Sequence, residues 1–467
     1  MNQAAPPSHR PGSAWRVYLI LVGLLVGAVL ALDVLDQGVG IRAISQADET
    51  DPTSISAGDM DIRQCLLPTR VGGSESYVTK AIDAYHKAGS GPKALRRIIV
   101  AKSALLKKSA DDELRLLAAR GTNYASEAEM WRAIHGPEPI SQDTARQYAS
   151  RIRELNLGPL IEVAISNVYE RSGQAARANA AMQSARDSAL VILAVAFGLV
   201  VVYIIAGVAG LILGIMFFVR HAAGLRNIPA PRLQPSVLLI SFLVYFVAYM
   251  CLDGVFGIGV GILGFTSDNV VDTCVGLVFQ LLSMAGAFAL GLAAFRNLTV
   301  LTGEDPAEIG LRFRPIKDKV IWGLGAFCAC LPLLILARVV TQWLLGTVFR
   351  NVQTPPHPII SDVTRGGLPF LLSLVIAVVA APVIEEIAFR GYLYTALRSS
   401  VGVWGAALLS AAIFAAIHPT IPGEFLSLLA LGVVLAVVRE KTGSLLPSMV
   451  CHAVNNLLTL LLTYFQS

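Results

Sequence analysis

The stretch Ala-Pro-Val-Ile-Glu-Glu-Ile-Ala-Phe-Arg, residues 381–390, places two adjacent carboxylates inside a long apolar run. Apolar residues precede the pair from Leu368 onward and resume after Arg390. A carboxylate at membrane depth costs several kcal/mol if it stays charged and unpaired. Such a pair is tolerated only where it faces a partner or a water-filled cavity. The stretch therefore predicts a functional site on a membrane-embedded helix.

The composition of the whole chain is that of a multi-pass membrane protein. Of its 467 residues, 55% are hydrophobic and 15% are charged, and the mean hydropathy is +0.63. These values exclude an ordinary soluble enzyme. The net charge of +5 is modest and no basic tract carries interleaved aromatic residues, so nucleic acid is not an expected partner. Only one of the six cysteines, Cys65, lies outside the predicted spans, which excludes a disulfide framework.

Charged residues gather in one window of the chain. Residues 33–187 hold 20 of the 37 Lys and Arg residues and 20 of the 32 Asp and Glu residues. We interpret this window as a soluble, mostly helical insertion after the first span. Within it, two amphipathic pieces separated at Ser172-Gly173 predict a helical hairpin over residues 157–182. Residues 45–75 are rich in Ser, Asp, Gly and Thr and predict an irregular loop.

Apolar segments predict an all-α, polytopic membrane helix bundle with about eight or nine transmembrane helices. Residues 17–32 follow two arginines without a small-x-small cleavage site, so residues 1–32 are expected to be an uncleaved membrane anchor. The other predicted spans are 189–219, 235–264, 273–295, 319–348, 367–397, 403–418, 424–438 and 445–464. All of these except 403–418 and 424–438 are long enough to cross about 30 Å of hydrocarbon.

The positions of basic residues predict the orientation in the membrane. The loop Arg220–Arg232 carries three arginines, and Arg296–Lys319 carries five basic residues. Short loops rich in Lys and Arg stay in the cytoplasm. We therefore expect an integral protein of the cell membrane with a cytoplasmic N-terminus and with residues 33–187 on the outer side.

The glutamate pair splits into two roles on helical geometry alone. Adjacent helical residues point about 100° apart, so Glu386 can pair with Arg390 at i, i+4 while Glu385 faces elsewhere. Pro382 lacks an N–H group and is expected to kink the helix near the pair. The alternative is a purely structural ion-pair network that joins both glutamates to Arg390 and Arg398.

Two further polar patterns follow on later helices. Phe414-x-x-x-His418 closes a short apolar helix, and His452-x-x-x-Asn456 places an imidazole and a carboxamide on one helical stripe. Taken singly, such residues are more often interfacial or bonded to a neighbouring helix. Taken together with Glu385, they supply what amide hydrolysis in a membrane requires. A carboxylate deprotonates water, a histidine orients it, and further donors stabilise the oxyanion.

In this order on late helices, the three patterns resemble the CPBP family of intramembrane proteases, which includes the CAAX prenyl proteases of the Rce1 type, also called the Abi family. The resemblance covers about residues 365–464 and makes 365–467 the expected catalytic core, preceded by membrane helices at 188–364. It implies that Glu385 activates water with help from His418. It further implies an oxyanion site formed by His452 and Asn456, and structural support from Glu386, Arg390 and Phe414.

The part played by a metal stays open on the sequence. Glu385, His418 and His452 would supply one carboxylate and two imidazoles, a set found in catalytic zinc sites and suited to other divalent metals. No His-Glu-x-x-His is present to fix two imidazoles on one helix. The family is often named as metalloproteases, yet a metal-free glutamate mechanism accounts for the same residues.

The leading prediction is an intramembrane endopeptidase that cleaves a protein or peptide substrate at the bilayer. The alternative is a non-catalytic membrane scaffold or bacteriocin-immunity-type factor whose insertion, residues 33–187, binds a protein partner. A transporter is disfavoured, because no paired Gly- or Pro-broken spans occur in both halves. Alternating spans would place His418 near the outer face, so the site requires that segments 403–418 and 424–438 be short, tilted or incompletely crossing.

Overall fold

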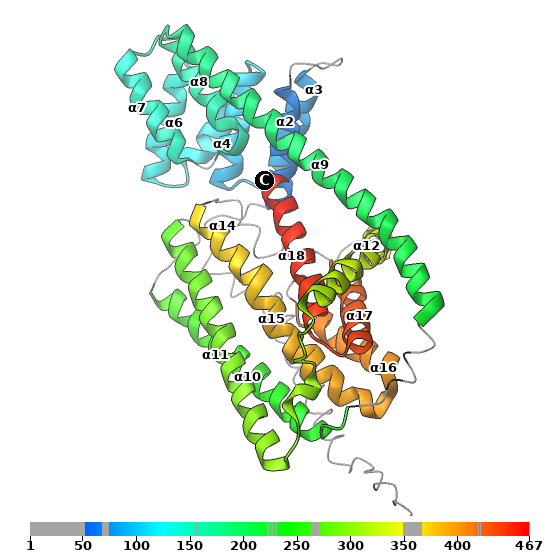
Figure 1. Cartoon of the computed structure of the whole chain (residues 1–467). Coiled ribbons are helices and arrows are strands. Elements are labelled where there is room, and N and C mark those ends of the chain that lie inside the picture. Colours follow the sequence, from blue (N-terminus) through cyan, green and yellow to red (C-terminus); the bar gives the residue numbers. More distant parts are fainter. Residues whose placement is uncertain are drawn as a thin grey trace, which may run out of the picture. The chain divides into compact units, whose positions relative to one another are not determined.

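The computed structural model of the chain describes residues 52–67, 74–155, 157–221, 225, 228, 231–263, 270–348, 367–418, 420 and 422–466 (Figure 1). Every regular element among these residues is a helix, so the predicted all-α class is confirmed. The predicted anchor at 17–32 lies outside the described residues. The chain divides into two compact units, formed mainly by the described residues 52–201 and 202–460.

The first unit is built from short helices joined by tight turns. They are α2 (Pro52–Cys65), α3 (Ser74–Lys87), α4 (Pro92–Val100), η2 (Ala101–Leu105), α5 (Asp111–Ala118), α6 (Thr122–His135), α7 (Gln142–Glu154), η3 (Gly158–Leu160), α8 (Ile161–Arg171) and the first part of α9 (Ala175–His221). Neighbouring helices pack in pairs, and Trp131 is fully buried in the shared core. Ser141 caps α7 by accepting a hydrogen bond from the Thr144 N–H.

Two predictions about this unit have different outcomes. The predicted hairpin is confirmed, because α8 ends at Arg171 and α9 begins at Ala175 after a turn at Ser172-Gly173. The irregular loop predicted over 45–75 is wrong for α2. Ile55 and Ile62 bury one face of that helix, and Asp59 between them is paired with Arg97. Its polar residues thus serve the core, which their abundance alone does not reveal.

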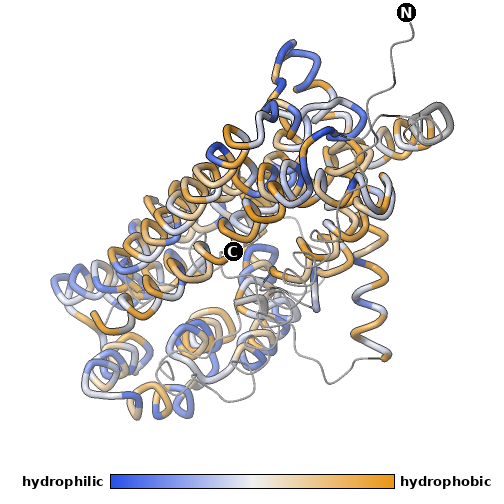
Figure 2. The backbone as a smooth tube through the Cα atoms, turned by 90° about the horizontal axis from the view of Figure 1, so that it is seen from below, coloured by the Kyte–Doolittle hydropathy of each residue, from blue (hydrophilic) through white to orange (hydrophobic). Residues whose placement is uncertain are grey.

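The second unit contains the long apolar helices. They are the remainder of α9, α10 (Pro235–Ile262), α11 (Val270–Thr302), η5 (Pro306–Ile309), α12 (Ile316–Thr347), α14 (Gly367–Leu374), η6 (Val375–Ala380), α15 (Ala381–Glu385), η7 (Glu386–Leu393), α16 (Tyr394–Ala416), α17 (Phe425–Thr442) and α18 (Leu446–Gln466). Figure 2 shows mainly hydrophobic colouring along these helices.

Six helical runs in the described part of the chain are long and apolar enough to cross a membrane. They are Ala175–Met216, Pro235–Val260, Val270–Thr302, Ile316–Thr347, Gly367–Ala416 and Leu446–Tyr464. Large apolar side chains such as Phe197, Ile205 and Val339 are mostly exposed on these runs. Exposed apolar surface of this extent is what a helix presents to lipid. The chain is an integral membrane protein.

The number of spans depends on the last hundred residues. The predicted spans 367–397 and 403–418 form one helical run of 50 residues, which is broken at Gly402 (φ 74°, ψ −179°). This backbone conformation is essentially restricted to glycine. Helix α17 carries three charged residues in its last turns and is not among the six runs. A count of eight or nine spans stays a prediction.

The two basic loops meet at one end of the membrane unit. The Arg232 N–H donates to Glu308 Oε2 at 2.7 Å, and the Gln234 N–H donates to Glu304 Oε1 at 2.9 Å. Arg398 Nη2 donates to the Ile228 carbonyl at 2.7 Å. Both loops therefore belong to the same end of the bundle, as their common cytoplasmic assignment requires. The side of the membrane that this end faces stays a prediction.

Candidate active site

The glutamate pair lies where an α-helical turn passes into a π-helical one. Helix α15 ends at Glu385, η7 begins with Glu386, and a second π-helical segment, η6, precedes α15. A π-turn shifts side-chain directions relative to an α-helix and recurs at functional sites. Both carboxylates thus leave the helix at a point where its regular geometry changes.

Pro382 explains one contact of the site. The Ala381 N–H bonds to the Ile376 carbonyl, in the π-helical pattern. Continuing this pattern, the Ala377 carbonyl would accept a bond from residue 382, but Pro382 has no N–H to donate. Asn456 Nδ2 of α18 donates to that carbonyl at 2.8 Å instead. The proline therefore creates the acceptor that anchors Asn456.

Glu386 joins an arginine to a histidine. Its Oε1 accepts hydrogen bonds from Arg390 Nη1 at 2.9 Å and from His452 Nδ1 at 3.1 Å, and its side chain is fully buried. The predicted Glu386–Arg390 pair is therefore present. The bond to His452 goes beyond that prediction. Because Nδ1 donates to the carboxylate, the other ring nitrogen, Nε2, is directed elsewhere.

Glu385 is the accessible member of the pair. Its side chain is 20% exposed, against none of Glu386, and its Oε2 lies 3.9 Å from His452 Nε2. That separation is too long for a direct hydrogen bond. It does allow one water molecule to lie about 2.8 Å from both atoms and bridge them. The two groups can therefore hold a water between an acid and a base.

Phe414 brings the third helix to the site. Its ring lies 4.5 Å from the His418 ring and 5.8 Å from the His452 ring, both edge-on, and Arg390 stacks over it at 4.5 Å. His418 Nδ1 lies 2.6 Å from the Phe414 carbonyl. A carbonyl only accepts, so Nδ1 carries the proton and Nε2 is the basic nitrogen of the neutral ring.

The break at Gly402 makes this meeting possible. After it, the second part of α16 packs against η7, where Phe414 contacts Phe389 at 5.2 Å. The segment 403–416 therefore brings His418 to the glutamate helix. The sequence required that the segment before His418 be short, tilted or incompletely crossing. In the structure, the chain reverses at Gly402 and this segment returns along η7.

The structure brings six of the seven predicted residues into one connected cluster and places the seventh, Asn456, one helical turn from it. Glu385, Glu386, Arg390, Phe414, His418 and His452 are linked by the contacts above, and Asn456 lies on α18 one turn beyond His452. Residues 367–458, which include all seven, match the family model described as type II CAAX prenyl endopeptidase, Rce1-like.

The chain carries an Rce1-like domain. The predicted resemblance to the CPBP family is thereby confirmed for this segment. Neither a curated protein nor a solved structure matches the chain.

The predicted metal ligands are Glu385, His418 and His452. Among the residues that the structure describes, no three His, Cys, Asp or Glu side chains converge as metal ligands would. Glu385 and His452 lie close together, whereas the His418 ring is oriented by its bond to the Phe414 carbonyl. The donor set does not fit zinc in this arrangement, so no step is derived through a metal. A site formed by Glu385, His418 and His452 stays a prediction.

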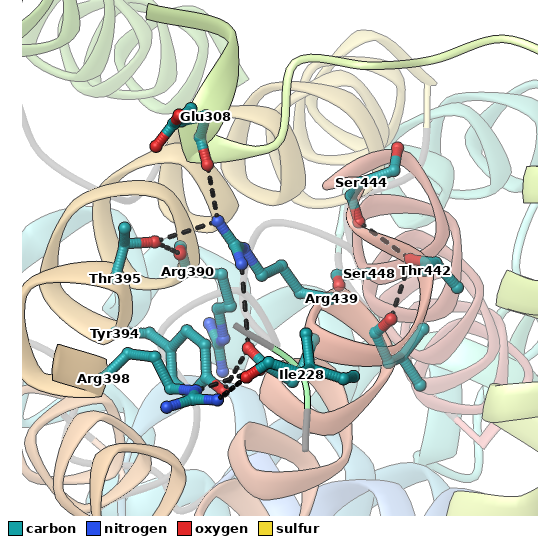
Figure 3. A network of polar contacts seen from close by, with 12 residues as sticks. Ile228, Glu308, Arg390, Tyr394, Thr395, Arg398, Arg439, Thr442, Ser444 and Ser448 are labelled. Carbon is teal, nitrogen blue, oxygen red and sulfur yellow. Dashed lines mark hydrogen bonds and ion pairs between the residues drawn. The ribbon is translucent and has the colours of Figure 1, made fainter. Parts of the chain in front are cut away.

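A second polar network, which reaches the Arg390 carbonyl through Thr395, holds one end of the Rce1-like domain together (Figure 3). Arg398 Nε donates to Glu440 Oε1 at 2.9 Å, and the Tyr394 hydroxyl donates to Glu440 Oε2 at 2.8 Å. Arg439 Nη2 donates to Thr395 Oγ1 at 3.1 Å. This network ties α16 to α17. It also shows that Arg398 pairs with Glu440 and not with the glutamate pair, so a purely structural network would rest on Arg390.

Sequence analysis missed two tyrosines beside the Rce1-like site. Tyr245 and Tyr249 of α10 both interact electrostatically with the Glu385 carboxylate. They are spaced i, i+4 and so share one face of an apolar span. That spacing was the available signal, but α10 lies more than a hundred residues before the glutamate pair, and no local pattern connects them.

Proposed function

We propose that this chain is an intramembrane endopeptidase in which Glu385 activates water for attack on a peptide bond at the membrane. The Rce1-like match supports a membrane peptidase. The observation that supports the mechanism is the 3.9 Å separation of Glu385 Oε2 from His452 Nε2, at the accessible end of an otherwise buried cluster.

The reaction begins with a water molecule held between these two groups. Glu385 accepts one proton from the water, and the hydroxide oxygen bonds to the carbonyl carbon of the substrate. His418, whose Nε2 is basic, helps to orient the water. When the tetrahedral intermediate collapses, the C–N bond breaks and the proton on Glu385 passes to the leaving amine. The carboxylate is then ready for another cycle.

The oxyanion of that intermediate needs hydrogen-bond donors. Asn456 has two N–H groups on Nδ2, of which one bonds to the Ala377 carbonyl and the other can reach substrate. His452 Nε2 is a second donor when the ring carries protons on both nitrogens, since Nδ1 already donates to Glu386. Donors fixed in advance in a site of low dielectric constant are worth several kcal/mol in the transition state.

Glu386, Arg390 and Phe414 act as positioning residues in this proposal. Arg390 is fully buried, and its Nη2 also donates to the Gly432 carbonyl at 3.3 Å. It holds the Glu386 carboxylate, which in turn holds His452. Phe414 separates the two histidine rings and fixes the distance between them.

The substrate is proposed to be a peptide segment at the membrane surface, with a prenylated C-terminal Cys-a-a-X peptide as the first probe because of the family match. The same peptide without the prenyl group separates recognition of the lipid from recognition of the sequence. The protein is further proposed to reside in the cell membrane with a cytoplasmic N-terminus. The first helical unit would then lie outside and could bind a protein partner.

The decisive experiment compares wild type with Glu385→Gln in proteoliposomes, using a fluorogenic prenylated Cys-a-a-X peptide. Removal of the general base should lower kcat by about 1000-fold, while circular dichroism and thermal unfolding stay unchanged, because Gln keeps the size of the side chain. Comparative proteomics of membranes carrying either form should show fragments only with wild type. Full cleavage by Glu385→Gln would refute the mechanism. Repeating the wild-type assay with a chelator tests the metal.

A further inference from the structure

Helix α10 forms a second wall of the site, although it precedes the late helices by more than a hundred residues. Phe242 of α10 meets Phe389 of η7 edge-on, with ring centroids 5.4 Å apart. Phe242, Tyr245 and Tyr249 follow the spacing i, i+3, i+7 and share one face of the helix. Phe389 stands four residues after Glu385 in the helical run. The two tyrosines therefore belong to the face of α10 that packs on the glutamate helix.

Tyr245 is held rigidly at this wall. Its side chain is only 6% exposed, and its ring stacks on Tyr249 with centroids 6.4 Å apart. Gly291 of α11 packs directly on it, since a Cβ atom at that glycine would lie 2.7 Å from the Tyr245 Cβ. Packing of this kind fixes the direction of a side chain better than a surface loop can.

The hydroxyl of Tyr245 is nevertheless not engaged by any residue that the structure describes. Among the described residues it has no hydrogen-bond partner, although it interacts electrostatically with the Glu385 carboxylate. The Tyr245 oxygen is also not fully enclosed. Tyr392 Oη differs in this respect, because it is fully buried without a partner among the described residues. Buried phenols normally find a partner. A rigid O–H donor beside the Glu385 carboxylate, without an acceptor in the described part of the chain, is placed for a group that arrives with the substrate.

The other hydrogen-bond donors of the site are already partly used in bonds within the protein. His452 Nδ1 donates to Glu386, and one N–H of Asn456 donates to Ala377. The oxyanion is thus left with His452 Nε2, which donates only when the ring is protonated, and a single amide N–H. A neutral phenol donates over the whole physiological pH range. It would add a second donor that does not depend on protonation of His452 to the single amide N–H of Asn456.

We propose that Tyr245 is a further catalytic residue, which donates a hydrogen bond to the oxyanion of the tetrahedral intermediate; this rests on the proposed peptidase function. The phenol keeps its proton throughout, and no bond to it forms or breaks. Its hydrogen bond strengthens as the substrate carbonyl gains negative charge and weakens when the intermediate collapses. Tyr249, further along the same face, is not required for this role.

The test is Tyr245→Phe in the proteoliposome assay with the prenylated Cys-a-a-X peptide. Loss of one oxyanion donor should lower kcat by about 100-fold, with KM changed less than about twofold and the acid limb of the pH profile unmoved. Tyr392→Phe is the matched control. It removes a buried tyrosine hydroxyl from the same unit and should leave kcat unchanged. Wild-type kcat in Tyr245→Phe would overturn the proposal.

Incorporation of 3-fluorotyrosine at position 245 separates the hydroxyl from the packing of the ring. Fluorine makes the phenol a stronger donor at nearly constant size, so kcat should equal or exceed that of wild type. A loss as large as that of Tyr245→Phe would show that packing is responsible and would also overturn the proposal. Glu385→Gln in the same assay keeps the two hypotheses apart. If it cleaves, the peptidase mechanism fails; if only Tyr245→Phe cleaves normally, the role of Tyr245 fails.

Discussion

Each unit of the molecule contains a buried arginine–carboxylate network, and the two networks are satisfied to different degrees. In the first unit, Arg97 Nε and Nη2 donate to the two oxygens of Asp59 at 2.9 and 3.0 Å, and the Tyr85 hydroxyl adds a bond of 2.6 Å. In the Rce1-like domain, Arg390 contacts Glu386 through one oxygen. The second oxygen, Oε2, and Arg390 Nε are buried without a partner among the described residues.

This difference agrees with the proposed function, in which the first network is structural and the second takes part in the reaction. A buried carboxylate whose acceptor positions are filled has nothing to offer a ligand, and it fixes one arrangement of the helices. A network with unmet hydrogen-bonding capacity persists only where something else stabilises it. Glu386 lies next to Glu385, which is accessible, and to His452, which connects the two carboxylates. The under-satisfied network is therefore the one that we propose to act on a water and a substrate.

Removing the carboxylate from each network is expected to have the largest effects and tests whether the two networks differ in function. Asp59→Ala and Glu386→Ala should each destabilise the protein by about 3–5 kcal/mol, because each leaves a buried arginine without its counter-ion. Only Glu386→Ala should also abolish cleavage, since His452 loses its anchor. Thermal unfolding of the full chain in detergent and the peptide assay measure the two effects. A Glu386→Ala protein that is destabilised but fully active would contradict the assignment.

The buried histidines extend the comparison to pH. His452 faces carboxylates, whereas burial, followed by the nearby Lys107 and Arg171, lowers the pKa of His135 to about 4. The unfolded chain binds a proton near pH 6.5 that folded His135 does not bind until about pH 4. Stability contributed by neutral His135 is complete above pH 6.5 and falls by up to about 3 kcal/mol as the pH drops to 4.

The measurement for His135 is denaturant unfolding of the full chain between pH 4 and 7. His135→Gln, which cannot take up a proton, should flatten the decline of stability over this window. An equally steep decline in the variant would assign the pH dependence to other groups.

The smallest effects come from two glycines that cover the networks. A Cβ at Gly158, where φ is +54°, would lie 2.5 Å from Asp59 Oδ2, and one at Gly432 would lie 2.7 Å from the Ala411 Cβ. Each change to Ala should cost about 1–3 kcal/mol through overpacking. Gly432→Ala should also lower kcat, because the Gly432 carbonyl holds Arg390. Equal kcat values for the two variants would remove the distinction between the networks.

Local patterns were sufficient for much of this protein. The apolar runs predicted the membrane helices, and the i, i+4 spacing predicted the Glu386–Arg390 pair. The same local rules failed at α2, where the charged residue Asp59 is buried against Arg97, 38 positions away. They did divide the run 367–416, because the predicted spans 367–397 and 403–418 leave the break at Gly402 between them. At α2, by contrast, a distant contact overrides composition.

The sequence by itself determined that the chain is a helical membrane protein, and it predicted which late residues form the candidate site. Hydropathy and helical spacing can be read from the sequence because both are patterns of residues within a few helical turns of each other. Only the tertiary structure decided which of these residues contact one another. The bond from Glu386 to His452, the anchoring of Asn456 on the carbonyl that Pro382 leaves open, and the approach of Tyr245 to Glu385 join residues 66, 79 and 140 positions apart. Such contacts depend on how whole helices pack, which no local pattern specifies.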